Sequence, residues 1–355
     1  MTTIALAGGG TGGHITPLLA VVQEIGNRAT CVVIGTQGGR EEELLPGDVP
    51  IIHRVPRLPF PRRLTLRALA YPFAWLAAVW ATRRALTRES IDVLVGFGGY
   101  TAAPSYLAAW LAGIPLVIHE ANAIPGLANR LGARLTTRVG VCFPGTPLPH
   151  GTVVGMPLRR EIAQLDPGAQ RAAARRHFGL RPRKPVVLVT GGSSGAKRIN
   201  DTIDEVAEDI VRAGWQVLHL RGPGQEAPTA AVVDVHRVDY TDRMDLAFAA
   251  SDLVISRAGA ATVSELGVVG LPAVFVPYHV GNGEQRKNAA YAVGRGGALM
   301  VETEAFTPQW VRDELIPLLG NREAIAQMAH AMAESAQRGG ARAIAEMALD
   351  AVGEA

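Results

Sequence analysis

Short apolar runs alternate with segments of helical periodicity along most of the chain. Near the N-terminus, the apolar run at 2–7 leads through a glycine-rich loop into a segment whose apolar positions recur at helical spacing. The same plan returns at 184–190, where an apolar run precedes a glycine loop and a periodic segment at 201–214. Further strand candidates end in polar or glycine-rich turns, at 29–35, 91–99, 114–120, 215–222, 251–259 and 272–277. Buried parallel strands have this character, so the pattern predicts an α/β fold with two Rossmann-like domains and parallel sheets.

The length of the chain favours two domains. A single hydrophobic core usually stops growing below the 355 residues present here. The predicted hinge is the Pro- and Gly-rich stretch at 143–162, which has little periodic pattern. We expect domains at 1–157 and 158–335, and a C-terminal helix at 336–355 that packs back towards the N-terminal domain. Open parallel sheets bind ligands outside the carboxyl ends of their strands, so the site is expected in a central cleft that both sheets face.

Charge is distributed unevenly along the chain. The net charge is +3, but residues 1–160 hold 15 Arg and no Lys against 8 acidic residues, which gives that part +7. A basic N-terminal half predicts an anionic surface as partner. No basic run is interleaved with aromatic residues, which disfavours nucleic acid and favours an anionic membrane.

The N-terminus predicts a cytoplasmic location, and the cysteines predict neither a disulfide framework nor a metal site. The first ten residues run straight into a strand and glycines, without the basic and apolar regions of a signal peptide. Cys31 and Cys142, the two cysteines of the chain, lie in apolar stretches and are expected to be reduced core thiols.

The sequence GGGTGGHITP at 8–17 combines a glycine loop with His14. Gly8, Gly10 and Gly13 formally fit a dinucleotide-binding motif. That motif needs an acidic residue about 20 positions on, where this chain has Gly35, so nicotinamide binding is disfavoured. His14 is either a polar residue in the first helical turn or a catalytic group at the carboxyl end of a strand.

Three stretches of the second half could bind a sugar nucleotide. GGSSGA at 191–196 offers loop amides and a helix N-terminus for a phosphate, or is an ordinary tight turn. It lacks the ending of a P-loop, so nucleoside-triphosphate hydrolysis is disfavoured. Glu265 lies one turn into the helix expected after 256–259, where it could accept ribose hydroxyls or simply face solvent. The stretch 278–289 is predicted to be a polar loop whose amides and carboxylates suit sugar hydroxyls.

A mainly apolar segment at 64–86 has two interpretations. Between Arg67 and Arg83 lie 15 uncharged residues interrupted by Pro72, fewer than the roughly 20 that span a bilayer. The segment is therefore either a buried core helix or a helix that docks at an anionic bilayer with its arginines at the headgroups.

Taken together, these stretches resemble the MurG family of peptidoglycan glycosyltransferases over nearly the whole chain. The resemblance rests on motifs in the family's order and spacing, at 9–17, 96–104, 118–130, 191–196 and 256–265. It implies a GT-B architecture and an inverting transfer of N-acetylglucosamine (GlcNAc) from UDP-GlcNAc to undecaprenyl-linked lipid I, forming lipid II. It also implies that no cofactor or essential bound metal is used. The expected location is the cytoplasmic face of the membrane, peripherally attached, where cell-wall synthesis and division proteins could be partners.

The resemblance also assigns residues. His14 falls on the histidine of the first loop and is the expected catalytic base, with Glu120 in reserve. The donor-side positions are Thr11, Gly12, Gly13, Asn122, Arg159, Ser193, Thr241, Met244, Ala260, Thr262, Glu265 and Gln285. The acceptor-side positions are Gly12, Gly13, Tyr100, His119, Glu120 and Asn129, with Asn122 among the polar positions of the same half. Within the donor set, Thr241 would meet the uracil through its backbone, Glu265 the ribose and Gln285 the sugar.

Three positions depart from the family's pattern. Ala121 stands where Gln is usual, Met156 replaces an Asn, and Glu284 occupies a position that is Gln in some members. The competing interpretations are another transferase of the same architecture, such as a glycolipid glucosyltransferase, a nicotinamide-dependent oxidoreductase, and a UDP-sugar-binding subunit without activity.

Overall fold

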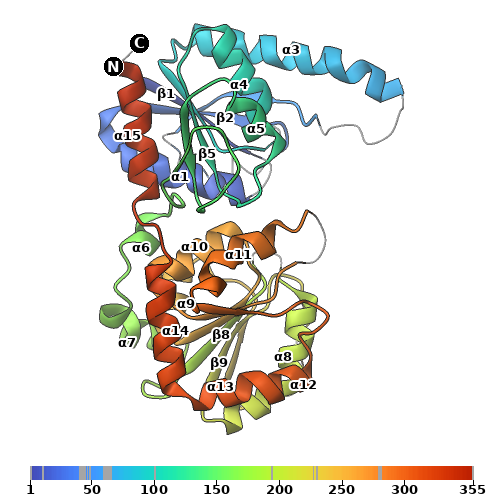
Figure 1. Cartoon of the computed structure of the whole chain (residues 1–355), viewed down its shortest axis with the longest axis vertical. Coiled ribbons are helices and arrows are strands. Elements are labelled where there is room, and N and C mark those ends of the chain that lie inside the picture. The colour runs from blue at the N-terminus through green and yellow to red at the C-terminus, as the bar shows by residue number, and fades with distance from the viewer. Residues whose placement is uncertain are drawn as a thin grey trace. The chain divides into compact units, whose positions relative to one another are not determined.

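The computed structural model divides the chain into two compact units (Figure 1). Unit 1 comprises Met1–Arg159 and Gln337–Ala355, and unit 2 comprises Arg160–Ala336. The structure describes residues 2–9, 12–39, 45, 47, 49–58, 66–99, 101–192, 195–226, 228, 231–278 and 282–353. Each unit is an α/β layer structure around one parallel sheet, so the predicted fold class is confirmed.

Unit 1 is built on a seven-stranded parallel sheet in the order β3-β2-β1-β4-β5-β6-β7. Its strands are β1 (Thr3–Ala7), β2 (Thr30–Thr36), β3 (Ile51–Val55), β4 (Val93–Gly96), β5 (Leu116–Glu120), β6 (Arg138–Val141) and β7 (Gly151–Val153). The helices are α1 (Gly12–Ile25), α3 (Leu66–Arg88), α4 (Ala102–Leu111), α5 (Leu127–Gly132) and α15 (Gly340–Gly353), with a 3₁₀ turn at Gly26–Arg28.

Successive side chains of these strands pack alternately into two separate hydrophobic cores, one on each face of the sheet. Ile4 and Leu6 of β1 point into the core on the side of α1 and α15, where Ile344 and Ala348 of α15 are buried. Ala5 lies in the core on the other face, against α3 and α4. A doubly covered sheet needs apolar residues on both faces, which explains why the runs are continuously apolar.

The C-terminal helix α15 belongs to unit 1 and packs on α1, β4 and β5. Its first residue, Gly340, passes so close to the chain at Met156 that a Cβ would lie 2.6 Å from the carbonyl oxygen of Met156. A glycine lets the helix begin at this close approach.

Unit 2 repeats the plan with a six-stranded parallel sheet in the order β10-β9-β8-β11-β12-β13. Its strands are β8 (Val186–Thr190), β9 (Gln216–Leu220), β10 (Val235–Val238), β11 (Leu253–Ser256), β12 (Ala273–Phe275) and β13 (Ala298–Met300). The helices are α6 (Arg160–Ala163), α7 (Pro167–His177), α8 (Lys197–Arg212), α9 (Met244–Ala250), α10 (Ala260–Val269), α11 (Glu284–Gly294), α12 (Pro308–Trp310), α13 (Ile316–Gly320) and α14 (Arg322–Glu334). A π-helical turn, Val311–Leu315, joins α12 to α13.

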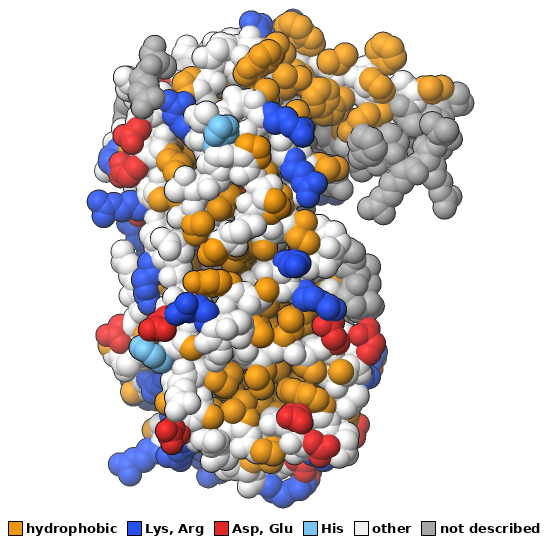
Figure 2. Space-filling model, in the orientation of Figure 1, with side chains coloured by type: hydrophobic (Ala, Val, Ile, Leu, Met, Phe, Trp, Pro, Cys, Tyr) orange, Lys and Arg blue, Asp and Glu red, His pale blue; other side chains and the backbone are white. Residues whose placement is uncertain are grey.

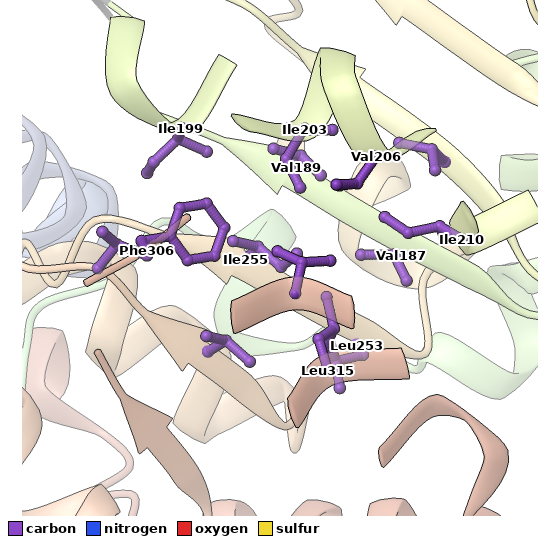
Figure 3. Close-up of a cluster of buried hydrophobic side chains, with 14 of the residues drawn as sticks. Val187, Val189, Ile199, Ile203, Val206, Ile210, Leu253, Ile255, Phe306 and Leu315 are labelled. Carbon is purple, nitrogen blue, oxygen red and sulfur yellow. The ribbon is translucent and has the colours of Figure 1, made fainter. Parts of the chain in front are cut away.

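The main core of unit 2 lies between the sheet and α8 (Figure 3). Val187 and Val189 of β8 meet Ile203 and Val206 of α8 there, and Phe306 closes one end of the cluster. All five side chains are fully buried. At roughly 1.5–3 kcal/mol for each buried aliphatic or aromatic side chain, this packing fixes α8 against the sheet and with it the loop that precedes α8.

Candidate active site

Both sheets have a topological switch point, where neighbouring strands lead to connections on opposite faces. In unit 1 it lies between β1 and β4, and in unit 2 between β8 and β11. Ligands of open α/β sheets bind at the carboxyl ends of such strands. The glycine motifs predicted from the sequence follow these four strands, two in each unit.

His14 lies in the first turn of α1, directly after the β1 loop, and is half-buried. Its ring rests on the loop that follows β4: a Cβ placed on Gly98 would be 3.5 Å from Nε2 of His14, and one on Gly99 would be 3.5 Å from Nδ1. Burial lowers the pKa of His14 below its ordinary value. The imidazole is therefore neutral at neutral pH and able to accept a proton.

Gly99 is required by geometry at this crossing. Its φ is +86°, in the region that favours glycine, and a Cβ there would lie 2.7 Å from the carbonyl oxygen of Gly9. The β1 and β4 loops thus approach each other backbone to backbone, with His14 at the same point. A side chain at Gly99 would push the two loops apart.

A buried hydrogen-bond chain runs from the β4 loop to the end of β5. The Gly98 N–H donates to Oη of Tyr106 (3.2 Å), whose hydroxyl donates to Oδ1 of Asn129 (2.7 Å). Nδ2 of Asn129 donates to Oε2 of Glu120 (2.9 Å) and to the carbonyl oxygen of His119 (3.1 Å). The chain ties the loop beneath His14 to the residues that close β5.

Glu120 accepts hydrogen bonds on both carboxylate oxygens. The Asn122 N–H donates to Oε1 (2.9 Å), and the Gly126 N–H donates to Oε2 (2.9 Å) beside the bond from Asn129. The side chain is 3% exposed. Burial raises the pKa of Glu120, and these hydrogen bonds counteract the shift. The carboxylate holds the segment 121–126 in place and has its acceptor sites occupied by its own chain.

His119 is likewise buried and points at the chain near β7. Its Nε2 donates to the carbonyl oxygen of Gly155 (2.9 Å). Burial lowers the pKa of His119 to about 4, so the ring is neutral. With Asn129, also buried, His119 supports the site from inside unit 1, whereas Gly13 is exposed on the surface.

In unit 2, glycines shape the β8 loop at 191–196. A Cβ on Gly191 would lie 2.2 Å from the Ala196 nitrogen, and one on Gly195 (φ +74°) would lie 2.2 Å from the carbonyl oxygen of Arg221. At Gly191 and Gly195 the loop thus packs closely on Ala196 and on Arg221, the residue that follows β9. Helix α8 begins after it with no side-chain cap at Ala196, so backbone donors remain for an anion.

Most of the other residues expected on the donor side lie at or just before helix starts of unit 2. Ala260, Thr262 and Glu265 belong to α10, whose N-cap Gly259 carries no capping side chain, and Glu265 is half-buried. Met244 begins α9, and Oγ1 of Thr241 accepts the Arg243 N–H (3.0 Å) just before it. Arg159 ends the first stretch of unit 1.

The prediction of a polar loop over 278–289 is wrong from Glu284 onwards. Helix α11 begins at Glu284, so Gln285 and Asn288 lie on a helix. Oε1 of Gln285 accepts the Tyr278 N–H (2.9 Å), which fastens this helix to the chain after β12. The segment mixes polar and apolar residues without a clear helical period, so the start of α11 could not be recognised from the sequence.

Four predicted positions lie wholly or partly outside the description. Thr11, Tyr100 and Ser193 are among the residues that the structure does not describe. Gly12 is described only as the first residue of α1.

Two residues of the site were not foreseen from the sequence. Tyr106 carries the hydrogen-bond chain, and its ring occupies the space where Gly96 and Gly132 lack side chains. Arg257 donates from Nη1 to the carbonyl oxygen of Val276 (2.9 Å) and to Oγ1 of Thr303 (2.7 Å), joining the ends of β11 and β12. The glycines at positions 96 and 132 were the available signs that a large ring lies nearby.

Comparison with known proteins identifies the family. The glycosyltransferase family 28 N-terminal domain matches residues 4–141, and the C-terminal domain of that family matches residues 186–344. A protein of Clavibacter sepedonicus named UDP-N-acetylglucosamine--N-acetylmuramyl-(pentapeptide) pyrophosphoryl-undecaprenol N-acetylglucosamine transferase is 51% identical over 99% of this chain and 97% of its own length. The chain belongs to the MurG family.

Other MurG proteins support the same assignment. A protein of the same name from Streptomyces coelicolor is 42% identical over 98% of both chains. The crystal structure of Acinetobacter baumannii MurG superposes with a TM-score of 0.81 at 28% identity, covering 99% of this chain and 100% of that one. The resemblance drawn from the motifs is therefore confirmed, and the oxidoreductase alternative falls away.

Proposed function

We propose that this protein transfers GlcNAc from UDP-GlcNAc to muramyl-pentapeptide pyrophosphoryl-undecaprenol, lipid I, and so forms lipid II. The observation that carries the proposal is the near full-length identity of 42–51% to proteins named for this transfer. The position of His14 and of the β8 loop at the two switch points supports it independently.

The proposed mechanism is a single displacement with inversion. The acceptor sugar's 4-hydroxyl oxygen attacks the anomeric carbon of GlcNAc and forms the new bond. The bond from that carbon to the UDP oxygen breaks, and UDP leaves with the electron pair. His14 takes the hydroxyl proton. The loop amides and the N-terminus of α8 stabilise the negative charge that develops on UDP, and this stabilisation requires no metal ion.

His14 suits the role of base better than Glu120. The lowered pKa of His14 keeps its ring neutral, and the ring lies beside the loops after β1 and β4, where ligands of open α/β sheets bind. Glu120 is almost fully buried and already accepts three backbone and side-chain N–H groups. We therefore assign Glu120, His119 and Asn129 to positioning the acceptor side, with Gly12, Gly13 and Tyr100 nearer the substrate.

The donor is assigned to the second unit. Glu265 would accept the ribose hydroxyls, the backbone at Thr241 would meet the uracil, and the α11 start with Gln285 would read the sugar. The remaining donor positions of unit 2 are Ser193, Met244, Ala260 and Thr262. The family resemblance adds Thr11, Gly12, Gly13, Asn122 and Arg159, which belong to unit 1.

An exposed apolar face on α3 supports attachment to a membrane surface. Leu69, Phe73, Leu76 and Trp80 recur at helical spacing and are 48–76% exposed. Trp110 of α4, a helix packed against α3, is 55% exposed. Figure 2 shows the hydrophobic side chains gathered over α3. No helix among the described residues is long and apolar enough to cross a membrane.

The charge beside this face complements an anionic bilayer. The guanidinium of Arg83 lies 5.5 Å from the centre of the Trp80 ring, and Arg84 and Arg88 follow on the same helix. An apolar helical face flanked by arginines binds at the headgroup level of anionic lipids. We assign the protein to the cytoplasmic face of the membrane as a peripheral enzyme, with cell-wall synthesis and division proteins as candidate partners.

Calorimetry against three ligands tests the donor assignment. Titration with UDP-GlcNAc, UDP-glucose and NADH should give the highest affinity for UDP-GlcNAc and no binding of NADH. Product formation from lipid I then tests the acceptor. Tighter binding of UDP-glucose would favour a glycolipid glucosyltransferase and overturn the proposed donor.

A further inference from the structure

We infer that unit 2 carries a second anion site, formed by arginines at the edge of the sheet opposite to the glycine loops. A cavity of about 410 Å³ opens there. Its wall includes Pro185, Asp252 and Pro272, the residues directly before the first residues of β8, β11 and β12. The donor loops follow the other ends of these strands, so this cavity is separate from the proposed donor site.

Two of the cavity's arginines are fixed by one carboxylate. Arg171 and Arg175 of α7 both pair with Asp252, and Nη2 of Arg175 lies 2.8 Å from Oδ2. Arg175 is 5% exposed and also donates from Nε to the carbonyl oxygen of Ala250 (3.1 Å). These contacts hold the wall of the cavity rigid.

Two further arginines have no such partner. Arg183 and Arg322 line the same cavity, and the side chain of neither forms a hydrogen bond or ion pair with another described residue. Arg322 is the first residue of α14, a helix of 13 residues whose positive dipole end adds to the charge. Two guanidinium groups that are free to form paired N–H bonds favour a phosphate group over a simple halide ion.

An adjoining cavity of about 570 Å³ extends the positive region. It shares Arg183, Pro185 and Arg322 with the first cavity and adds Arg181 and Lys184. Arg181 and Lys184 pair with Asp234 at 2.7 and 2.9 Å. Six cationic side chains thus face two carboxylates, Asp252 and Asp234, which leaves four positive charges in excess.

Because the excess positive charge extends over two adjoining cavities, we take the ligand to be a small soluble anion with two phosphate groups. The first cavity is of the size that holds small organic ligands, typically about 300–1,000 Å³. Trp215 lines it beside Leu271 and Ile325, so the ligand could also carry an apolar part. The indole N–H of Trp215 donates to the carbonyl oxygen of Leu319 (3.0 Å), and the NMR signal of this N–H serves as the probe for the Trp215 side of the cavity wall.

The test follows the Trp215 indole N–H resonance by NMR during titration with inorganic pyrophosphate. The protein is first saturated with UDP so that the donor loops are occupied. The resonance is one of five tryptophan indole signals and is assigned with the Trp215→Phe variant. The Arg183→Ala/Arg322→Ala double variant is compared with Arg176→Ala, which removes an exposed arginine of α7 that does not line either cavity.

We expect a saturable shift of the Trp215 signal in the wild type and in Arg176→Ala. In the double variant, at least tenfold more pyrophosphate should be needed to reach half-saturation, whereas transfer activity should be unchanged. No saturable shift, or the same titration in the double variant, would overturn the site. A response to vesicles containing phosphatidylglycerol without one to pyrophosphate would instead contradict the assignment to a soluble anion.

Discussion

Asn129 donates a hydrogen bond of 2.9 Å from Nδ2 to Oε2 of Glu120, and both side chains are almost completely buried. Asn129 receives a hydrogen bond from Tyr106, which in turn accepts the Gly98 N–H beneath His14. The Glu120 carboxylate is therefore part of the scaffold that positions the β4 and β5 loops.

Glu120→Gln should weaken this scaffold. The glutamine amide replaces one acceptor oxygen with an N–H donor that faces N–H groups, and an unsatisfied buried group costs about 1–3 kcal/mol. We expect a lower free energy of unfolding by urea and a raised KM for lipid I. The acid limb of the pH–rate profile should not move, since Glu120 is not the base. A double-mutant cycle with Asn129→Ala should be non-additive, and fully additive losses would contradict the coupling.

Glu265→Ala should weaken UDP-GlcNAc binding. Hydrogen bonds to a charged group are worth about 1.5–3 kcal/mol, so the dissociation constant should rise by roughly one to two orders of magnitude. Calorimetry of the donor alone measures the effect. Glu323→Ala on α14 serves as the control for the loss of one negative charge in unit 2. An unchanged dissociation constant of UDP-GlcNAc in Glu265→Ala would remove Glu265 from the ribose site.

Phe73→Asp/Trp80→Asp should reduce binding to anionic vesicles in sedimentation experiments. Both side chains belong to the exposed face of α3, and a charge there opposes burial at the membrane surface. Val233→Asp, at an exposed apolar position of unit 2, is the matched control and should bind as the wild type does. Wild-type binding should also fall as salt is raised or anionic lipid is removed. Vesicle binding that depends neither on salt concentration nor on anionic lipid content would refute the electrostatic part of the proposal.

Acid should destabilise the protein through two buried histidines. Burial lowers the pKa of His119 to about 4 and that of His219 to about 3, from an ordinary value of 6.5. Below pH 6.5 the unfolded chain binds protons that the folded chain does not. The free energy of unfolding therefore falls as pH decreases from 6.5 towards 4, by up to about 1.4 kcal/mol per pH unit for each histidine. Stability from this source is complete above pH 6.5.

The free energy of unfolding is measured with urea at several pH values from about 7.5 to about 5, a range that includes the ordinary histidine pKa. His219→Gln should give a shallower pH dependence, while His330→Gln, which changes an exposed histidine, should leave the slope as it is. Equal slopes in His219→Gln and in the wild type would show that His219 does not contribute.

The sheets were predictable where strands are buried on both faces. β1, β5, β8 and β11 each contain three or four successive apolar residues, because helices cover both sides of these strands. The edge strands β3 and β10 were missed because Ile51–Val55 and Val235–Val238 carry His and Arg within short, partly exposed segments. β7 and β13, three residues each, also lie at sheet edges.

The site was predictable where the backbone conformation requires glycine, because such positions are visible in the sequence. Glycine loops after strands marked both switch points, and His14 followed one of them. The partners of Glu120 could not be predicted, because Asn129 and Tyr106 reach it through tertiary packing. The unpaired Arg183 and Arg322 are 139 positions apart in sequence and share a cavity only in the folded unit.

The central claim is that His14 removes the proton from the acceptor hydroxyl. The most direct measurement is kcat of His14→Ala with UDP-GlcNAc and lipid I, beside the dissociation constant of UDP-GlcNAc. Loss of a general base should lower kcat by about 10² to 10⁴ while donor affinity stays near the wild-type value. The wild-type rate should fall only at a pH below the ordinary histidine range, since burial lowers the pKa of His14, and the variant should lack that limb. A variant that keeps more than about a tenth of wild-type kcat would contradict the assignment, because a general base contributes more than that.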